Sequence, residues 1–218
     1  MAWTVRDAGL VILLATAGSG CQDWRERVRG GLAVKEPEQT LVATAAPTRA
    51  LFPPRDEPDA PPSVPATLTP RARYRIRAWV VAKDRGFDDD AADVLTLDLG
   101  LAWGPVASPD LLRSLSFRLD TRYLSLRWSE ALPLDGATLM RHVSNHHLVV
   151  PDAALRAYLD HAQVGDLVTL EGQLVDVTLE GTSGRVVRSS LSRDDIGNGA
   201  CEVLWVERAQ LERPWLEP

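Results

Sequence analysis

The stretch RHVSNHHLVVPDAALRAYLDH, residues 141–161, contains all four histidines of this 218-residue chain and lies between two groups of strand-like segments. Its first half is poor in helix formers and leads into Pro151, which favours extended backbone just before it. Asp152 then starts a pattern that places Leu155 and Leu159 on one face of a helix. The stretch therefore predicts an extended segment followed by a short helix, and we expect the domain to be organised around it.

Alternating apolar and polar residues predict strands on both sides of residues 141–161. The predicted strands cover residues 73–80, 95–103, 123–128, 168–179 and 201–206, with residues 186–189 pairing back across a turn at 181–184. A change in the apolar phase beside Gly172 predicts a β-bulge, and Ser108 followed by Pro109 predicts the start of a short helix. We therefore expect a mainly β (α+β) domain over residues 73–210, a small curved antiparallel sheet or partly open barrel with one or two short helices, and a tail at 211–218.

The N-terminus has the features of an export signal. Arg6 precedes an uncharged run over residues 8–20, which is too short to span a bilayer as a helix. Small residues precede Cys21, as in the lipobox of bacterial lipoproteins, although that family usually has leucine where this chain has Gly18. We expect lipidation at Cys21; cleavage without lipid, an uncleaved anchor, no export at all and a disulfide with Cys201 are the alternatives.

Residues 37–70 contain nine prolines among alanine, threonine, serine and acidic residues. Such a segment buries too little apolar surface to offset its chain entropy, so we expect a disordered proline-rich tether at residues 21–72, after a signal peptide at residues 1–20. The formal net charge of −6 disfavours nucleic acid as a partner. These features predict an exported lipoprotein of the outer membrane or periplasm, with anchoring in the inner membrane as the alternative.

Two kinds of chemistry are open to the histidine stretch. His142 and His146 could bind zinc with Asp152 or His161, but the extended local sequence and the lack of a closed Cys/His spacing favour no metal site. Cys201 could act as a nucleophile if a histidine accepts its proton, or it could simply pack in the core, as free cysteines often do. The candidate catalytic residues are His147, Cys201 and Asp195, and the candidate binding residues are Asn145, Arg193, Asn198 and Glu202. No cofactor is expected.

Three motifs in the C-terminal half resemble those of a group of uncharacterised bacterial exported or membrane-anchored proteins. They are SNHHL at residues 144–148, GDLVTLEGQL at 165–174 and RDDIGNGACE at 193–202. The group has asparagine where this chain has His146 and tyrosine where it has Gln173, which weakens any site built on His146. The resemblance implies a shared fold over residues 74–207 and no mechanism, because the group has no assigned activity.

The anchor, the tether and the lack of a recognisable active-site motif favour a non-enzymatic domain that binds a protein partner in the periplasm or at the cell surface. The alternative is an envelope hydrolase that uses His147 with Cys201 or Asp195. The two hypotheses differ in one geometric respect. Catalysis gains support if His147, Arg193, Asp195 and Cys201 surround one pocket.

Overall fold

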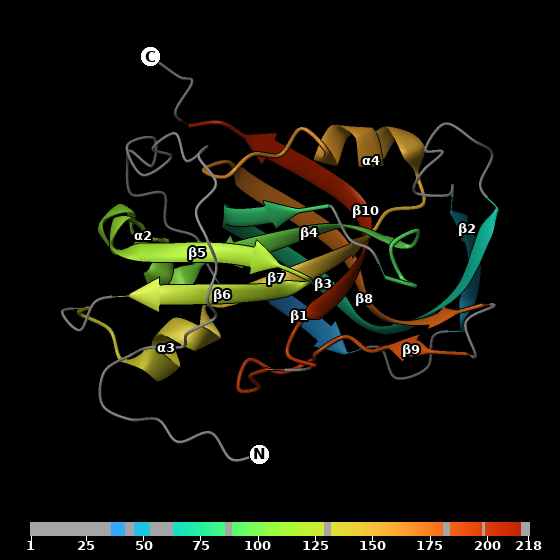
Figure 1. The fold of residues 1–218 in the computed structure, drawn as a ribbon, viewed down its shortest axis with the longest axis horizontal. Helices are drawn as coiled ribbons and strands as arrows, with labels where there is room; N and C mark the ends of the chain where they lie inside the picture. The colour runs from blue at the N-terminus through green and yellow to red at the C-terminus, as the bar shows by residue number, and fades with distance from the viewer. Residues whose placement is uncertain are drawn as a thin grey trace.

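The computed structural model describes residues 36–41, 46–52, 63–85, 89–128, 132–180, 184–197 and 199–214. Within these ranges the fold is mainly β, as predicted: an eight-stranded mixed sheet curves around the core, and a two-stranded hairpin lies beside it (Figure 1). The strands are β1 (Glu38–Leu41), β2 (Thr48–Phe52), β3 (Val64–Asp84), β4 (Leu95–Ala102), β5 (Leu115–Asp120), β6 (Tyr123–Trp128), β7 (Val143–Val149), β8 (Leu167–Leu179), β9 (Val186–Val187) and β10 (Glu202–Glu212). The helices are the 3-10 helix η1 (Gly104–Ala107), α2 (Pro109–Ser114), α3 (Gly136–Arg141) and α4 (Ala153–Leu159).

Five strands pair around a partial ring in the order β3, β4, β7, β10 and β8, and β8 pairs again with β3. Every pair in this ring is antiparallel except β7 with β10, in which Glu202 lies beside His146. The sheet is therefore mixed rather than purely antiparallel. A parallel pair needs a long crossover connection, and α4, β8 and β9 lie between β7 and β10 in the chain.

The folded domain begins before the predicted boundary at residue 73. β1, β2 and the first nine residues of β3 lie inside the segment predicted as a disordered tether, so that prediction is wrong for these strands. Ala66 and Leu68 are fully buried in β3, and the half-buried Thr67 lies between them. The ladder with β8 shifts just after Pro70, where a residue without an N–H is tolerated. The high proline content led to a prediction of disorder for a segment whose apolar residues alternate as in an ordinary strand.

The irregularity predicted at Gly172 is present, but the register shifts in the partner strand. β8 continues through Gly172, while the register of β10 shifts between Val206 and Arg208. A Cβ at Gly172 would lie 2.0 Å from the backbone oxygen of Trp205, so glycine is needed for this close approach. β10 then continues to Glu212, two residues into the predicted tail.

Side-chain caps start the three α-helices. The Ser108 hydroxyl accepts a hydrogen bond from the N–H of Leu111 (3.3 Å) at α2, and the Asp152 carboxylate accepts one from the N–H of Leu155 (2.7 Å) at α4. Both starts agree with the sequence prediction, which misses α3, capped in the same way by Asp135. None of the helices in the described ranges combines the length and hydropathy needed to cross a membrane.

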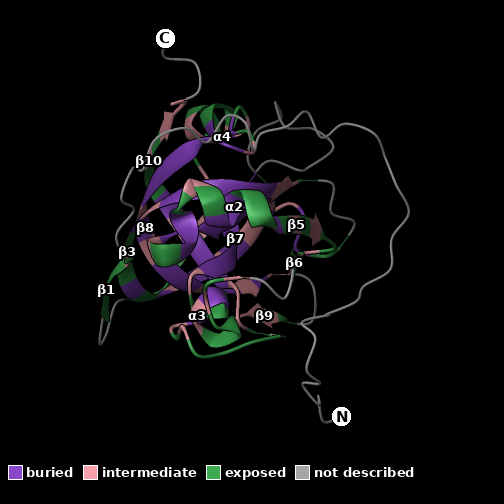
Figure 2. Cartoon of the chain, turned by 90° about the vertical axis from the view of Figure 1, so that its left-hand side faces the viewer, coloured by how far each residue is buried: buried purple, intermediate pink, exposed green. Residues whose placement is uncertain are grey.

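The core lies inside the partial ring, where β4 and β7 are almost continuously buried and β3 alternates between buried and exposed residues (Figure 2). The Trp79, Leu99 and Leu170 side chains fill it from β3, β4 and β8. β7 is buried along its whole length. The first half of the histidine stretch is thus a strand in the middle of the sheet, and this position determines the chemistry of its polar side chains.

Candidate functional site

β7 carries four polar side chains through the centre of the sheet, between β4 and β10. Successive side chains of a strand alternate between its faces, so Ser144 and His146 share one face and Asn145 and His147 share the other. Buried polar groups are costly unless they are hydrogen-bonded, and each pair has partners on its own face. We call Asp98, Asn145, His147 and Cys201 the thiol cluster, and Tyr74, Ser144, His146, Arg193 and Glu202 the glutamate cluster.

In the thiol cluster, His147 connects a buried carboxylate to a cysteine. Its Nδ1 lies 2.7 Å from Oδ2 of Asp98, which is fully buried on β4 and is the ladder partner of His147. Cys201, the residue just before β10, is a near neighbour of the same ring and is one of the groups that raise its pKa. Because Nδ1 is paired with the carboxylate, Nε2 is the ring nitrogen that is available to the sulfur atom. Carboxylate, imidazole and thiol therefore follow one another in the order of a catalytic triad.

The surroundings of His147 hold its ring in the protonated form. Burial by itself would lower the pKa of His147, but hydrogen bonds and charge interactions with Asp98 and Cys201 outweigh it and raise the pKa to about 9. The ring is therefore an imidazolium at neutral pH.

Asp98 is held from two further sides. The Asn145 amide nitrogen donates to Oδ2 of Asp98 (2.9 Å) and to the backbone oxygen of Arg122 (2.9 Å). The Arg122 guanidinium lies 3.2 Å from the other carboxylate oxygen and also pairs with Asp89. Thr121 and Arg122 form the turn between β5 and β6 with φ angles of 46° and 66°, which residues other than glycine adopt at an energetic cost. These contacts fasten the β5–β6 hairpin to the thiol cluster.

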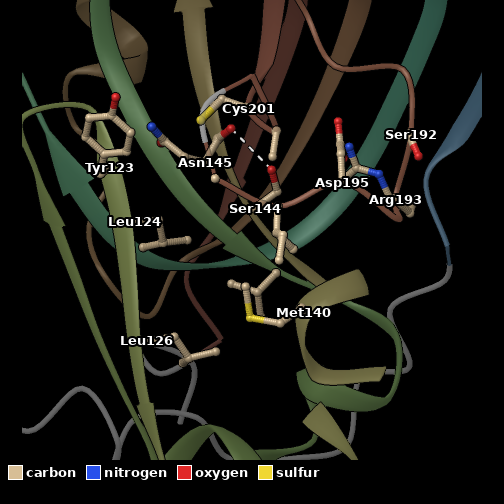
Figure 3. A pocket seen from close by; sticks show the side chains of 14 residues that line it. Tyr123, Leu124, Leu126, Met140, Ser144, Asn145, Ser192, Arg193, Asp195 and Cys201 are labelled. Carbon is tan, nitrogen blue, oxygen red and sulfur yellow. Dashed lines mark hydrogen bonds between the residues drawn. The ribbon is translucent and has the colours of Figure 1, made fainter. Parts of the chain in front are cut away.

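Cys201 opens onto a pocket of about 110 Å³ that lies between β6, α3, β7 and the loop before β10 (Figure 3). The lining residues used below are Tyr123, Leu124, Leu126, Met140, Val143, Asn145, Arg193, Asp195, Ile196 and Cys201. Cys201 is half-buried, whereas His147 is only 7% exposed and, like Asp98, is not part of the lining. A ligand in the pocket can therefore reach the sulfur atom while the imidazole remains shielded from water.

The glutamate cluster fills the opposite face of β7. Glu202 is fully buried, pairs with Arg193 and accepts a hydrogen bond from the Ser144 hydroxyl. The Arg193 guanidinium also lies 5.5 Å from the centre of the Trp103 ring, at the distance of a cation–π contact. Arg193 thus joins the wall of the pocket to the core of the domain.

The second half of the glutamate cluster is neutral. The Tyr74 hydroxyl lies 3.1 Å from Nε2 of His146. Burial, followed by the positive charge of Arg193, lowers the pKa of His146 well below its usual value, and burial raises the pKa of Tyr74. The two adjacent histidines of β7 are therefore in opposite protonation states at neutral pH, because only His147 has a carboxylate within hydrogen-bond distance.

Of the candidate residues named from sequence, His147, Cys201 and Asn145 come together in the thiol cluster, and Arg193 and Asp195 line the same pocket. Asp195 does not take the predicted place beside His147; its carboxylate accepts a hydrogen bond from the Ser190 hydroxyl at 2.6 Å. Glu202 has no exposed surface, so it supports the wall of the pocket and cannot contact a ligand there. The predicted residues Cys21 and Asn198 lie outside the described part of the chain.

Sequence reasoning missed Asp98 and Arg122. Alternation places Asp98 on the same side of its strand as Thr96, opposite the leucines, and a polar side of this kind usually faces water. The available signal was that its other neighbours on that side, Gly100 and Ala102, are small and not polar, which is unusual for an exposed face. Arg122 gave no comparable signal, because a charged residue in a predicted turn is ordinary.

The four histidines do not gather into one site. Nε2 of His142 pairs with Glu36 at 2.7 Å, Nδ1 of His161 lies 2.7 Å from the backbone oxygen of Ala157, and His146 and His147 face opposite sides of β7. Across the described ranges, no group of three or more His, Cys, Asp or Glu side chains is arranged to hold a metal ion. The four histidines are therefore close in sequence but lie in four separate environments.

No protein-family model matches the chain, and neither a curated protein nor a solved structure is significantly similar to it. The resemblance to exported bacterial proteins, drawn from the three sequence motifs, therefore stays a prediction. The geometry of the thiol cluster is what indicates a function for this chain.

Proposed function

We propose that the domain is a cysteine-dependent hydrolase that cleaves an ester, thioester or amide through an acyl-enzyme on Cys201. One observation carries the proposal: a single imidazole is paired with a buried carboxylate and neighbours a cysteine that lines a pocket. Cys201 is the nucleophile and His147 the acid and base. Asp98 is a positioning residue, because it fixes the tautomer and orientation of the His147 ring.

The reaction proceeds in two halves. The Cys201 thiolate attacks the carbonyl carbon of the substrate, and the C=O electron pair moves onto oxygen. When the tetrahedral intermediate collapses, the bond to the leaving alcohol, thiol or amine breaks and the His147 imidazolium donates its proton to that group. The now neutral His147 takes a proton from water, the resulting hydroxide equivalent attacks the thioester, and the acid departs as the thiolate re-forms beside the imidazolium.

The proposal includes the cellular location predicted from the N-terminus, export followed by lipidation at Cys21. It is supported by the sequence pattern around Cys21, which lies outside the described residues. The intact mass of the chain extracted from membranes tests it. A chain that starts at Met1 and carries no lipid would contradict this part of the proposal without affecting the chemistry.

The chemistry is tested on the full-length chain carrying Cys21→Ser, which leaves Cys201 as its single thiol. With p-nitrophenyl acetate near neutral pH, we expect a burst of p-nitrophenol and a single acetyl group on Cys201 in the intact mass. Cys201→Ala should remove both signals. His147→Gln and Asp98→Asn should slow acylation by about 10²- to 10⁴-fold, whereas His161→Gln, at an exposed histidine, should leave it unchanged.

A native chain that shows no burst, while the same thiol reacts after unfolding in urea, would rule out the nucleophile. Cys201 would then be a packing residue. The function predicted first from sequence, partner binding without catalysis, would be the one to pursue through co-purification from detergent-solubilised envelopes.

A further inference from the structure

The pocket at Cys201 has an apolar rim. Large apolar side chains are rarely exposed together in this domain, yet Tyr123, Met140 and Ile196 all line this one pocket with 49%, 42% and 71% of their surface exposed. They come from β6, from α3 and from the loop before β10. Clusters of exposed apolar side chains on a soluble domain commonly mark a binding site.

Below the rim the wall is apolar as well. Leu124 and Leu126 of the β5–β6 hairpin and Val143 of β7 line the pocket, and Figure 3 shows the two leucines and Met140 on the side away from Cys201. The charged side chains of the lining are occupied elsewhere: Arg193 pairs with the buried Glu202, and Asp195 accepts the hydrogen bond of Ser190. The surface left for a ligand is therefore mainly hydrocarbon.

We infer that the pocket holds the acyl part of the substrate and that this part is a short, uncharged aliphatic chain. The inference rests on the proposed function, because Cys201 in the wall requires the reacting carbonyl group to lie at the sulfur atom. The acyl chain then extends from Cys201 toward Leu126 and Met140, and the leaving group points outward. A pocket of about 110 Å³ has space for several water-sized groups in a row, which suits a chain of a few carbon atoms.

The acyl length of the substrate tests this inference without any change to the folded chain. The rate of acylation of Cys201 is measured with p-nitrophenyl acetate, butyrate and hexanoate, and each rate is divided by that of free cysteine with the same ester. Burial of one methylene group is worth about 0.8 kcal/mol, which corresponds to about fourfold in rate. The butyrate-to-acetate ratio should therefore be about 15, and the increase should end once the chain fills the pocket.

Two substitutions at the rim test where the chain binds. Met140→Gln and Ile196→Thr change exposed side chains, so the fold should persist. In both variants the butyrate-to-acetate ratio, corrected for free cysteine, should fall toward 1. Leu51→Gln is the matched control, because Leu51 on β2 is 42% exposed, as Met140 is, and does not line the pocket.

The outcomes separate this inference from the proposed function. If Cys201 is acylated at the same relative rate whatever the acyl length, or if the rim variants keep the full ratio, the aliphatic pocket is refuted and the hydrolase proposal stands. If no ester acylates Cys201 in the native chain, both fall together.

Discussion

Replacing Asp98 with asparagine should remove most of the pH dependence of stability between pH 6.5 and 9. The pKa of His147 is about 9 in the folded chain against an ordinary value of 6.5, and the Asp98 carboxylate is the largest of the influences that raise it. In this pH range the folded state keeps a proton that the unfolded state releases. The stabilisation is therefore complete below pH 6.5 and is lost as the pH rises through about 9.

The size of the effect follows from the two pKa values. A pKa that moves from 6.5 in the unfolded chain to about 9 in the folded chain corresponds to about 3 kcal/mol of stability. With asparagine at residue 98 the ring loses its carboxylate partner, and burial then favours the neutral imidazole. Asp98→Asn also leaves Arg122 without one of its partners, which lowers stability at every pH, so the slope against pH is the informative quantity.

The assay is urea unfolding at a series of pH values from 6 to 9, followed by the fluorescence of the tryptophans in the Cys21→Ser background. The parent chain should lose about 3 kcal/mol across this range, and both Asp98→Asn and His147→Gln should lose much less. His161→Gln is the matched control, because its exposed ring contacts only a backbone oxygen in the structure. It should keep the parent slope.

A flat stability profile between pH 6.5 and 9 in the parent chain would refute the imidazolium assignment for His147. An unchanged slope in Asp98→Asn would refute the role given to the carboxylate. Below pH 6.5 His146 has the opposite effect on stability, because its pKa is lowered in the folded chain. The unfolded state gains a proton on this histidine that the folded state does not, so stability falls as the pH falls. The effects of His147 and His146 on stability can therefore be measured separately, above and below pH 6.5.

Two further substitutions test the supports of the site. Arg122→Met should lower the free energy of unfolding by about 3 kcal/mol, because Asp98 keeps its burial and loses the guanidinium; a loss below about 0.5 kcal/mol in urea unfolding would show that the hairpin turn contributes nothing to Asp98. Gly172→Ala should cost several kcal/mol, since the new Cβ would lie 2.0 Å from the Trp205 oxygen. Gly136→Ala, where a Cβ meets nothing within 4 Å, should be neutral or slightly stabilising by the same measurement.

Local patterns predicted much of the strand content. The predicted strands at residues 95–103, 123–128 and 168–179 correspond to β4, β6 and β8 within one residue at each end, because a strand with one buried face alternates along its own sequence. The hairpin partner β5 and the edge strands β1 and β2 were missed. The residues of β1 and β2 carry little alternation, so these strands depend on the neighbours with which they pair. In β5, Leu115, Phe117 and Leu119 do alternate with polar residues, and the sequence prediction overlooked that pattern.

Local sequence also indicated where chemistry could occur. The sequence identifies His147 and Cys201 as candidates because imidazole and thiol are reactive groups wherever they lie, and it places Asn145 on the same strand face as His147. The polar character of the β7 residues is visible in the sequence, but their burial is not.

Only the tertiary structure decided which groups act together. Asp98 is 49 residues from His147 in the chain and meets it because β4 pairs with β7 in one register; a slip of one residue would turn the carboxylate to the other face. The parallel pairing of β10 with β7 then brings Cys201 to the same face of the sheet and Glu202 to the opposite one. Residue types are local properties of the sequence, whereas strand register comes from the packing of the whole sheet. Register places one of the four histidines of this stretch, His147, beside a carboxylate and a thiol.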